Sequence, residues 1–457
     1  MPDRTAALRA AAEHAEAFLS TLDDRPVAAR VDASTVRNTL GGPLPEVGED
    51  PAKVIDALAT GAEPGLVATA GPRHFGFVIG GALPAALAAD WLVSAWDQNA
   101  AFHSLSPAAA GIEEITSAWT LELLGLPATA SVGFVTGGQG ANTTCLAAAR
   151  NAVLTGAGWD VERDGLIGAP AVRILCGEQA HATIYTSLRL LGLGAETAIR
   201  IPADGQGRMD PDELAKALAA NDGPTIVCAQ AGNVATGAFD AFAPIADACT
   251  EHGAWLHVDG AFGLWAAAAP GNRHLTAGVE RADSWAVDAH KWLNVPYDGA
   301  MAIVANQDAH LAAMSLAGPY LVADPGQRDG TNYVPESSRR ARAIPIYAAI
   351  RSLGRAGIAE MIERNCAQAR RMAKQLAGIP GAAVLNDVVL NQVLVRLPGG
   401  DDANRAAVAA IQRDGTCWLG GTTYNGEYVV RVSISNWATT DADVDRSAAA
   451  VAAAVTV

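Results

Sequence analysis

A lysine in apolar surroundings is the first candidate for covalent chemistry in this sequence. Lys291 lies in the stretch Asp288-Ala-His-Lys-Trp-Leu. Lysine side chains are almost always solvated, but Trp292 and Leu293 make a buried position plausible here. Burial weakens the preference of the amine for its charged form, and the neutral amine is a nucleophile. From this stretch alone, a lysine with only a structural role remains equally open.

A carboxylate at the end of an apolar run is the second candidate. In the run 254–259, an alternation of period two places Trp255, His257 and Asp259 on one face of an expected strand. Asp259 stands at its carboxyl end, which is where α/β sheets bind ligands. An aspartate there can also be a helix cap or a turn residue. A metal held by His257 and Asp259 would lack a third ligand nearby.

A glycine-rich stretch, 133–150, is the third candidate. Its residues Gly138, Gln139 and Gly140 follow an apolar run and precede a helical pattern. Backbone N–H groups and the positive end of a helix can close on a phosphate at such a turn. A dinucleotide fingerprint would need Gly or Ala at Thr143, and the Gly-Lys-Ser/Thr of a P-loop is absent. A turn that serves packing alone stays open.

One cofactor accounts for the three candidates in this order. Pyridoxal 5'-phosphate (PLP) needs a phosphate cradle, a carboxylate for its ring nitrogen and a lysine for a Schiff base. From Arg73 to Ser435 the sequence resembles the PLP-dependent group II amino-acid decarboxylases, the family of the aromatic-L-amino-acid decarboxylases. The His-Lys pair is the most specific mark. Ala261 after His-Val-Asp and the stretch Gln179-Ala-His181 also fit.

The resemblance implies roles for the matching residues. Lys291 would carry the Schiff base, Asp259 would pair with the ring nitrogen, and His181 would stack on one face of the ring. The implied cofactor-binding set is Gly138, Gln139, Gly140, His181, Asn233, Asp259, Ala261, His290 and Lys291. In this set, Asn233 would lie near the ring hydroxyl and His290 would help to hold the phosphate. The role of Asp288, where relatives often carry Asn, stays open.

A long polar stretch, 317–338, shows no periodicity and is expected to be a surface loop with a function. By the resemblance, Tyr333 is the mobile-loop tyrosine that protonates the substrate carbon after carbon dioxide leaves. It would act as a catalytic residue together with Lys291, His181 and Asp259. Tyrosine in place of phenylalanine there favours simple decarboxylation over oxidative deamination. A loop tyrosine with no such role is the alternative.

The expected substrate pocket contains His74, Phe75 and Phe102, which fall where the family lines its side-chain pocket. Their aromatic surface suits an aromatic or imidazole substrate. Arg73 or an arginine of the cluster 339–342 could instead hold an acidic side chain. We expect decarboxylation of an L-amino acid, with an aromatic substrate slightly preferred. A PLP-dependent aminotransferase, a carbon–carbon lyase and a non-enzymatic binding protein remain as alternatives.

The elements that must position these residues follow from the pattern. Apolar runs alternate with helical stretches between residues 71 and 304, which predicts an α/β fold with a mostly parallel sheet covered on both faces. Strands are expected at 132–136, 172–176, 225–230, 254–259 and 300–304. Helices are expected at 108–124, 143–154, 343–376 and 441–455, and further strands at 388–397 and 427–435. The resemblance implies fold type I with a seven-stranded sheet.

Three parts are expected along the chain. Residues 1–70 should form a helical arm, residues 71–335 a large PLP-binding α/β domain, and residues 336–457 a smaller C-terminal α+β domain. The resemblance implies a homodimer whose active site lies at the subunit interface. The arm matches the N-terminal segment of the animal enzymes poorly.

Composition limits the partners. With 457 residues, 50% of them hydrophobic and 18% charged, the chain is expected to be a folded protein of two or three units. Its net charge of −16 disfavours nucleic-acid binding. The absence of a long apolar window and of a signal-peptide pattern predicts a cytoplasmic protein without a membrane span. The six scattered cysteines predict buried free thiols and no metal site.

Overall fold

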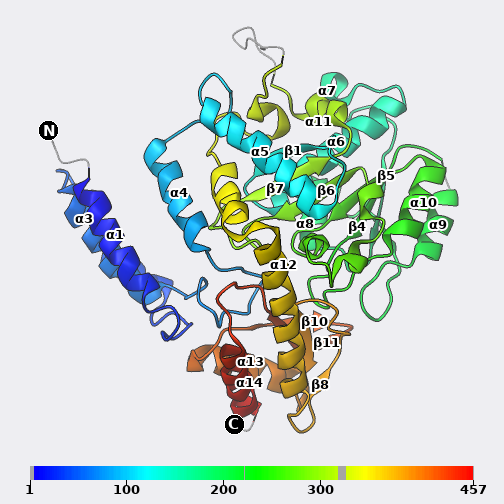
Figure 1. The fold of residues 1–457 in the computed structure, drawn as a ribbon. Coiled ribbons are helices and arrows are strands. Elements are labelled where there is room, and N and C mark those ends of the chain that lie inside the picture. The colour runs from blue at the N-terminus through cyan, green and yellow to red at the C-terminus, as the bar shows by residue number, and fades with distance from the viewer. Residues whose placement is uncertain (1–4, 221, 317–325, 456–457) are drawn as a thin grey trace.

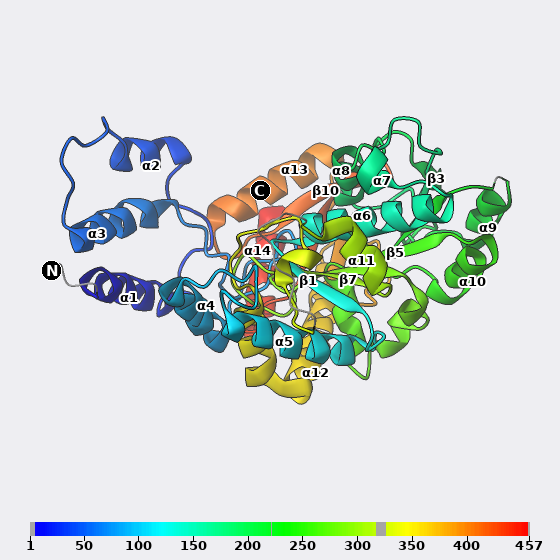
Figure 2. The same ribbon diagram turned by 90° about the horizontal axis from the view of Figure 1, so that it is seen from above.

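The computed structural model describes residues 5–220, 222–316 and 326–455. Figure 1 shows a large sheet-centred body, a smaller sheet with helices below it, and a helical arm that stands to one side. The arm contains α1 (Ala6–Leu19), α2 (Ala33–Leu40), α3 (Pro51–Ala62) and the short helix η1 (Glu63–Gly65). None of the residues in these helices is buried. Figure 2 shows the arm apart from the body in a second view.

The large sheet has seven strands in the order β1-β7-β6-β5-β4-β2-β3. Only the pairings of β7 with β1 and with β6 are antiparallel, so the predicted mostly parallel sheet is confirmed. The strands are β1 (Ser131–Val135), β2 (Arg173–Gly177), β3 (Ile199–Ile201), β4 (Thr225–Gln230), β5 (Trp255–Asp259), β6 (Ser284–Asp288) and β7 (Ala300–Val304). The central strands β4, β5 and β6 are buried along their whole length, as expected of a sheet covered on both faces.

Helices cover both faces of this sheet. One face packs against α6 (Gly138–Gly156), α8 (Ala182–Leu190) and α11 (Gln307–Met314). The other packs against α5 (Pro107–Leu124), α9 (Pro211–Ala219) and α10 (Phe242–His252). The remaining helical elements here are α4 (Pro84–Trp96), α7 (Val161–Asp164), η2 (Gly263–Ala268), η3 (Arg273–Thr276), η4 (Val279–Arg281) and η5 (Gly330–Tyr333).

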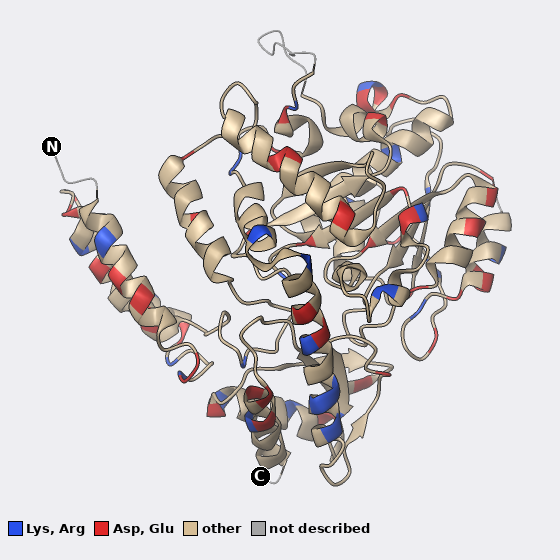
Figure 3. Cartoon of the chain, viewed as in Figure 1, with Lys and Arg blue, Asp and Glu red and all other residues tan. Residues whose placement is uncertain are grey.

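The second sheet is antiparallel, with the order β10-β11-β9-β8. This part contains β8 (Ala383–Val384), β9 (Gln392–Arg396), α13 (Gly400–Asp414), β10 (Gly420–Tyr424), β11 (Glu427–Ser433) and α14 (Asp441–Val455). The helix α12 (Ala343–Leu376) leads into it and carries both acidic and basic residues along its lower half in Figure 3. The division of the chain after residues 70 and 335 stays a prediction.

The helix α12 joins the two cores. Gly354 breaks its helical backbone with φ 61° and ψ 178°, a left-handed φ that glycine adopts without steric cost. Before the break, Ile344 packs with residues of α4. After it, Ile362 belongs to the core of the large sheet and Met372 to the core of the small sheet. One continuous helical segment therefore crosses from one core to the other.

Three buried histidines predict that acid destabilises the fold. Burial lowers the pKa of His74, His257 and His310 to about 4 in each case. Below pH ~6.5 these histidines are protonated in the unfolded chain but stay neutral in the folded chain. The free energy of unfolding therefore decreases as the pH is lowered. Each histidine should cost about 2 kcal/mol at pH ~5 relative to pH ~7. Asp240 opposes this loss of stability by about 1 kcal/mol. Burial raises its pKa to about 6, so the folded state binds the proton more readily than the unfolded chain does.

Urea unfolding at pH ~7 and pH ~5 should therefore show a loss of about 5 kcal/mol from these four groups. A His310→Asn variant should lose less, because one of the three histidines no longer titrates. An unfolding free energy that stays constant or rises at the lower pH would contradict the prediction.

Candidate active site

A cavity of about 270 Å³ lies at the carboxyl ends of β4, β5 and β6. The last residues of these strands, Gln230, Asp259 and Asp288, all line it. The other lining residues are Phe77, Gly137, Gly138, Gln139, His181, Thr183, Gly232, Val234, Ala261, Phe262, His290 and Lys291. The structure thus brings together the three stretches that the sequence analysis singled out.

The amine of Lys291 is held by a buried carboxylate. Its Nζ lies 2.9 Å from Oδ2 of Asp288, whose side chain is 2% exposed, and the lysine side chain is 22% exposed. The other oxygen, Oδ1, lies 3.4 Å from Nε2 of His290 and has no hydrogen-bond partner among the described residues. Burial lowers the pKa of His290. The lysine is therefore reachable from the cavity and fixed in direction.

The carboxylate of Asp259 is oriented from two sides. Its Oδ1 accepts the backbone N–H of Ala261 at 3.2 Å, and its Oδ2 accepts Nδ2 of Asn142 at 3.2 Å. Asn142 lies on α6 and is fully buried. The sequence analysis did not identify Asn142, because nothing in its local pattern points across the sheet to the end of β5.

Behind Asn142 a chain of hydrogen bonds runs back along β5. Oδ1 of Asn142 lies 2.9 Å from Nε2 of His257, and Nδ1 of His257 lies 3.0 Å from Oγ of Ser284. Trp255 donates from Nε1 to the same Oγ at 2.9 Å. Because Asn142 uses its amide hydrogen on Asp259, its oxygen accepts from His257 Nε2, so Nδ1 accepts from the serine hydroxyl. We call Trp255, Ser284, His257 and Asn142 the relay.

Replacing Asn142 with alanine should disturb Asp259 without removing it. The variant leaves Nε2–H of His257 buried and unpaired, which costs about 1–3 kcal/mol of stability. Cofactor affinity should fall as well, since the carboxylate loses one of its two fixed donors. Urea unfolding and a titration with PLP measure the two effects.

The matched control is Asn151→Ala on the same helix, whose Nδ2 donates to Glu162 at 3.5 Å outside the relay. It should lower stability without changing cofactor affinity. Unchanged affinity in Asn142→Ala would show that the relay does not orient Asp259.

His181 and Ala261, which are predicted to contact the cofactor, both line the cavity. His181 is the N-cap of α8, and its Nδ1 accepts the backbone N–H of Thr183 at 3.2 Å. Burial lowers the pKa of His181. Its ring is therefore neutral at pH ~7, with the hydrogen on Nε2. A neutral ring suits stacking on a flat ligand.

The start of α6 lines the cavity with Gly137, Gly138 and Gln139, which we call the cradle. A Cβ on Gly138 would lie 2.9 Å from Oδ2 of Asp288, and a Cβ on Gly137 would lie 3.2 Å from Cε1 of His290. Gln139 lines the cavity, while its side-chain Nε2 donates to Oγ of Ser187 at 2.8 Å. Glycine at these two positions therefore lets the side chains of Asp288 and His290 lie close to the start of the helix, whose backbone N–H groups can bind an anion.

Two predicted cofactor contacts do not line the cavity. At Gly140 a Cβ would face Thr136 and Val135, so this glycine packs against β1. Asn233 is 1% exposed, and its Oδ1 accepts the backbone N–H groups of residues 235 and 236 at 2.9 and 3.1 Å. Its neighbours Gly232 and Val234 line the cavity instead. The side chain of Asn233 serves the turn.

The structure places the residues predicted for the substrate pocket outside the lining of this cavity. His74 and Phe75 do not line the cavity, and they are only 3% and 1% exposed. His74 stacks on Trp418 with ring centroids 5.0 Å apart, and Phe75 belongs to the core of the small sheet. Phe77 lines the cavity in their place, is 66% exposed and stacks on Trp418 at 5.5 Å. Phe102 is half-buried and also lies outside the lining.

Tyr333 does not line this cavity. It is 6% exposed, its hydroxyl accepts Nε2 of Gln307 at 3.0 Å, and its ring lies edge-on to His310 at 5.3 Å. Arg328 lies over the ring at 3.8 Å. Residues 317–325 of the predicted loop lie outside the described residues.

The arginines considered for an acidic substrate are engaged elsewhere. Arg73 is 1% exposed, and its guanidinium donates to the backbone oxygen of Thr416 at 2.7 Å and lies 3.4 Å from Asp443. Arg339 pairs with the buried Glu113 at 2.6 Å. Neither lines the cavity around Lys291.

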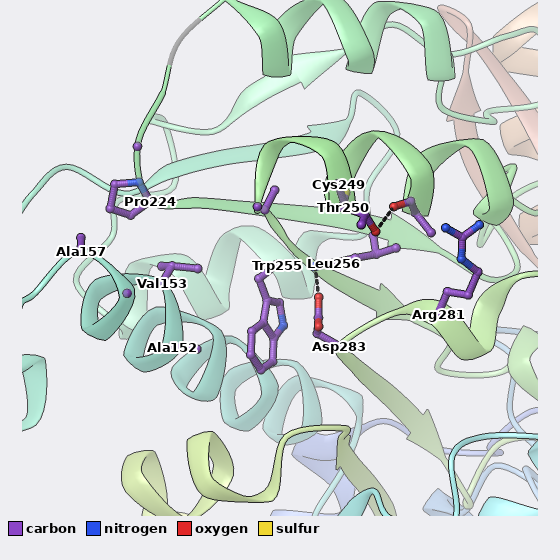
Figure 4. A pocket seen from close by; sticks show the side chains of 15 residues that line it. Ala152, Val153, Ala157, Pro224, Cys249, Thr250, Trp255, Leu256, Arg281 and Asp283 are labelled. Atoms are coloured by element: carbon purple, nitrogen blue, oxygen red, sulfur yellow. Dashed lines mark hydrogen bonds between the residues drawn. The ribbon is translucent and has the colours of Figure 1, made fainter.

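A second cavity of about 600 Å³ lies at the opposite end of β5, where Trp255 begins the strand (Figure 4). Mostly small and apolar side chains line it, together with Arg281 and Asp283. Both charges already have partners: Oδ2 of Asp283 accepts the backbone N–H of Leu256 at 2.8 Å, and Arg281 pairs with Asp247 at 2.7 Å. The relay therefore spans from this cavity to Asp259.

Three further findings concern the residues that the structure describes. All six cysteines are free and buried, as predicted. Within 5–220, 222–316 and 326–455, no group of three or more His, Cys, Asp or Glu residues is placed to hold a metal ion. In the same residues, no helix combines the length and the apolar character that crossing a membrane requires.

The donor set fits PLP on structural grounds. A reachable amine at Lys291, a buried carboxylate at Asp259 and a glycine cradle at the start of α6 surround one cavity. These are the groups needed to bind an aldehyde, a ring cation and a phosphate.

Comparisons with known proteins agree with this chemistry. Residues 36–397 match the family described as the pyridoxal-dependent decarboxylase conserved domain. An aromatic-L-amino-acid decarboxylase of Bacillus atrophaeus is 28% identical over 92% of this chain and 89% of its own length. An L-2,4-diaminobutyrate decarboxylase of Rhizobium meliloti is 30% identical over 86% of this chain and 80% of its own length.

Solved structures share the fold. Oryza sativa TDC with PLP and tryptamine superimposes with a TM-score of 0.91 at 24% identity, covering 98% of this chain and 97% of that one. Catharanthus roseus tryptophan decarboxylase in complex with L-tryptophan gives a TM-score of 0.88 at 20% identity, covering 100% and 99%.

Proposed function

This chain belongs to the pyridoxal-dependent decarboxylase family, and from that premise we propose that it converts an aromatic L-amino acid to the corresponding amine and carbon dioxide. Its cofactor is PLP, and it is a PLP-dependent amino-acid decarboxylase with a fold of type I. The finer points, namely the aromatic substrate, the residue roles and the dimer, are our proposals.

We propose the following residue roles, which the geometry of the cavity supports. When bound, PLP supplies a protonated ring that accepts the electron pair of the bond broken at the substrate's α-carbon. Lys291 would bind the cofactor covalently through Nζ, and Asp259 would hold the proton on the ring nitrogen. The neutral ring of His181 would pack on the cofactor, and the backbone N–H groups of Gly138 and Gln139 would bind the phosphate with help from His290.

The exposed ring of Phe77 at the cavity is the observation that carries the preference for an aromatic substrate. Trp418 stacks against the far side of this ring and supports it. An aromatic substrate gains stacking energy of about 0.5–1.5 kcal/mol on such a surface. An acidic substrate would need a cation, and Arg73 and Arg339 are paired elsewhere.

The test is to incubate the purified holoenzyme with a panel of aromatic, acidic and diamino L-amino acids and to identify products by mass. Aromatic amines with release of carbon dioxide are expected. Amines from acidic or diamino substrates alone would reject the aromatic preference but keep the reaction. A keto acid product would favour the alternative, an aminotransferase, and a carbon–carbon cleavage product would favour a lyase.

The proton donor predicted at Tyr333 stays a prediction and would have to act on the cavity of a partner subunit. Tyr333→Phe should keep the bound cofactor's colour and shift product from amine towards aldehyde, because the proton donor is lost. Tyr347→Phe, whose ring stacks on Trp119, is the control and should change neither. An unchanged product ratio in Tyr333→Phe would leave this residue with the packing role described above.

We also propose a homodimer with the active site at the interface, located in the cytoplasm. The arm supports the dimer, because its helices bury none of their residues within the chain while Val54 and Leu58 expose an apolar stripe of α3. Sedimentation equilibrium should give twice the chain mass. The double variant Val54→Glu/Leu58→Glu should shift it to monomer, whereas Lys53→Glu on the same helix should not. A monomeric wild-type protein would overturn the dimer.

A further inference from the structure

A threonine links the two side chains expected to contact the cofactor ring, His181 and Asp259. Nδ2 of Asn142 donates to Oδ2 of Asp259 at 3.2 Å and also to Oγ1 of Thr183 at 3.1 Å. Oγ1 of Thr183 in turn lies 2.8 Å from Nδ1 of His181. Thr183 belongs to α8, Asn142 to α6 and Asp259 to β5, so the link joins three elements.

The direction of each hydrogen bond in this link follows from the groups at its ends. The carboxylate of Asp259 only accepts, so the amide nitrogen of Asn142 faces it, since the opposite orientation would bring two oxygens together. An amide nitrogen only donates, so Oγ1 of Thr183 accepts from it. The hydroxyl hydrogen of Thr183 then points at Nδ1 of His181, which also accepts the backbone N–H of Thr183 at 3.2 Å. Two donors meet at Nδ1, so this nitrogen carries no hydrogen of its own.

Nε2 is the nitrogen of His181 that remains for a ligand. Among the described residues, both hydrogen bonds of the ring use Nδ1, and the ring lines the cavity. Burial lowers the pKa of His181, while Asp259 and Asp288 act to raise it and Lys291 and Arg431 to lower it. The ring is therefore neutral, with its hydrogen on Nε2. It offers the cavity a hydrogen-bond donor and no acceptor.

We propose that Thr183 is a positioning residue: held by Asn142, it fixes the ring of His181 so that only a hydrogen-bond donor faces the ligand. The group that receives this hydrogen must be an acceptor, such as an oxygen of the cofactor or of the substrate. His181 cannot serve as a general base there, because its lone pair already accepts from two donors. The amide of Asn142 also ties the orientation of this ring to the carboxylate of Asp259.

The experiment observes the two ring nitrogens directly. Protein whose histidines carry an NMR-active nitrogen isotope is studied with and without PLP, and His181→Gln identifies the signals of this ring among the nine histidines. In the wild type, Nε2 should carry the hydrogen, and Nδ1 should show the shift of a bare nitrogen that accepts hydrogen bonds. In Thr183→Val, which removes the hydroxyl and keeps the shape, the Nδ1 signal should move towards that of a free nitrogen. Thr183→Ser keeps the hydroxyl and should restore the wild-type signal.

The part played by Asn142 is tested on the same signal. Asn142→Ala should move the Nδ1 signal of His181 in the same direction as Thr183→Val, because the hydroxyl of Thr183 is no longer held. Thr144→Val is the matched control: this buried threonine lies on α6 as Asn142 does, and its hydroxyl has no hydrogen-bond partner among the described residues. It should leave the signals of His181 unchanged.

Cofactor affinity provides a second measurement, and it alone rests on PLP as the ligand. Pyridoxine 5'-phosphate lacks the aldehyde and does not react with Lys291, so its dissociation constant reports the non-covalent contacts. This constant should rise by roughly threefold to tenfold in Thr183→Val, which is the effect of one lost hydrogen bond. It should return close to the wild-type value in Thr183→Ser and stay unchanged in Thr144→Val.

Four results would overturn the proposal. A hydrogen on Nδ1 in the wild type would mean that the ring offers the cavity an acceptor. An unchanged Nδ1 signal in Thr183→Val, or one that Thr183→Ser fails to restore, would remove the role of the hydroxyl. An unchanged signal in Asn142→Ala would remove the tie to Asp259. If pyridoxine 5'-phosphate did not bind the wild type, the cofactor assignment would fall, while the NMR signals would still decide which nitrogen of His181 faces the cavity with a hydrogen.

Discussion

Lys291→Ala is expected to abolish the yellow colour of the bound cofactor and all decarboxylation above background. The reason is that Nζ of Lys291 provides the amine at the cavity, held 2.9 Å from Asp288. Visible absorbance measures the loss directly. In the wild type, borohydride reduction followed by digestion should yield a peptide with the cofactor attached at residue 291. Recovery of that peptide unmodified would contradict the whole assignment.

Loss of the amine must be separated from loss of the ion pair. Alanine leaves the buried carboxylate of Asp288 without its partner, which costs about 3–5 kcal/mol of stability. Lys291→Arg retains a positive charge beside Asp288 but offers no amine of comparable nucleophilicity. It should unfold closer to wild type than Lys291→Ala and still lack the covalent cofactor. Covalent labelling in the arginine variant would show that another amine reacts.

The second large effect is expected for Asp259→Ala. Removing the buried counter-ion of the ring cation costs about 3–5 kcal/mol. This corresponds to a factor of roughly a hundred to several thousand in the reaction rate. The turnover rate should fall by that order, and cofactor affinity should fall with it. Steady-state kinetics at saturating PLP and a cofactor titration separate the two effects.

A half-buried aspartate just before β6 provides the control. Asp283 accepts the backbone N–H of Leu256 at 2.8 Å at the opposite end of β5, far from Lys291 along the strand. Asp283→Asn should lower stability and leave turnover unchanged. Full activity in Asp259→Ala would reject the role given to this carboxylate, whatever the control shows.

The central sheet could be predicted from the sequence because its strands are buried on both faces. The runs 225–230 and 300–304 coincide with β4 and β7 at both ends. β3 has only three residues, two of them exposed, so no apolar run marks it. No strand is predicted over β6, since Ser284 and Asp288 interrupt its apolar pattern. The long helix 343–376 was predicted with both ends correct, but its break at Gly354 was not.

The candidate site was predictable where its residues are close in sequence. Asp259 ends β5, the glycines lie at the start of α6, and Lys291 belongs to a short His-Lys stretch that follows β6. Phe77 lines the cavity in place of His74 and Phe75, and both it and Val78 adopt positive φ values, 57° and 61°, that no local pattern marks. His74 pairs with Trp418, a partner just before β10 that local pattern cannot reveal. The relay was missed for the same reason.

The break in α12 determines where this chain can tolerate insertions and deletions. From Ile358 to Leu376 the helix is continuous, and its two ends belong to different cores. Deleting one residue in this stretch would turn everything beyond it by about 100°, and would take the apolar stripe of one core out of register with the other. Gly354 has open space around its Cα and tolerates either sign of φ, so it can absorb such a change. Length variants among homologues should therefore cluster before Gly354 and spare the stretch after it.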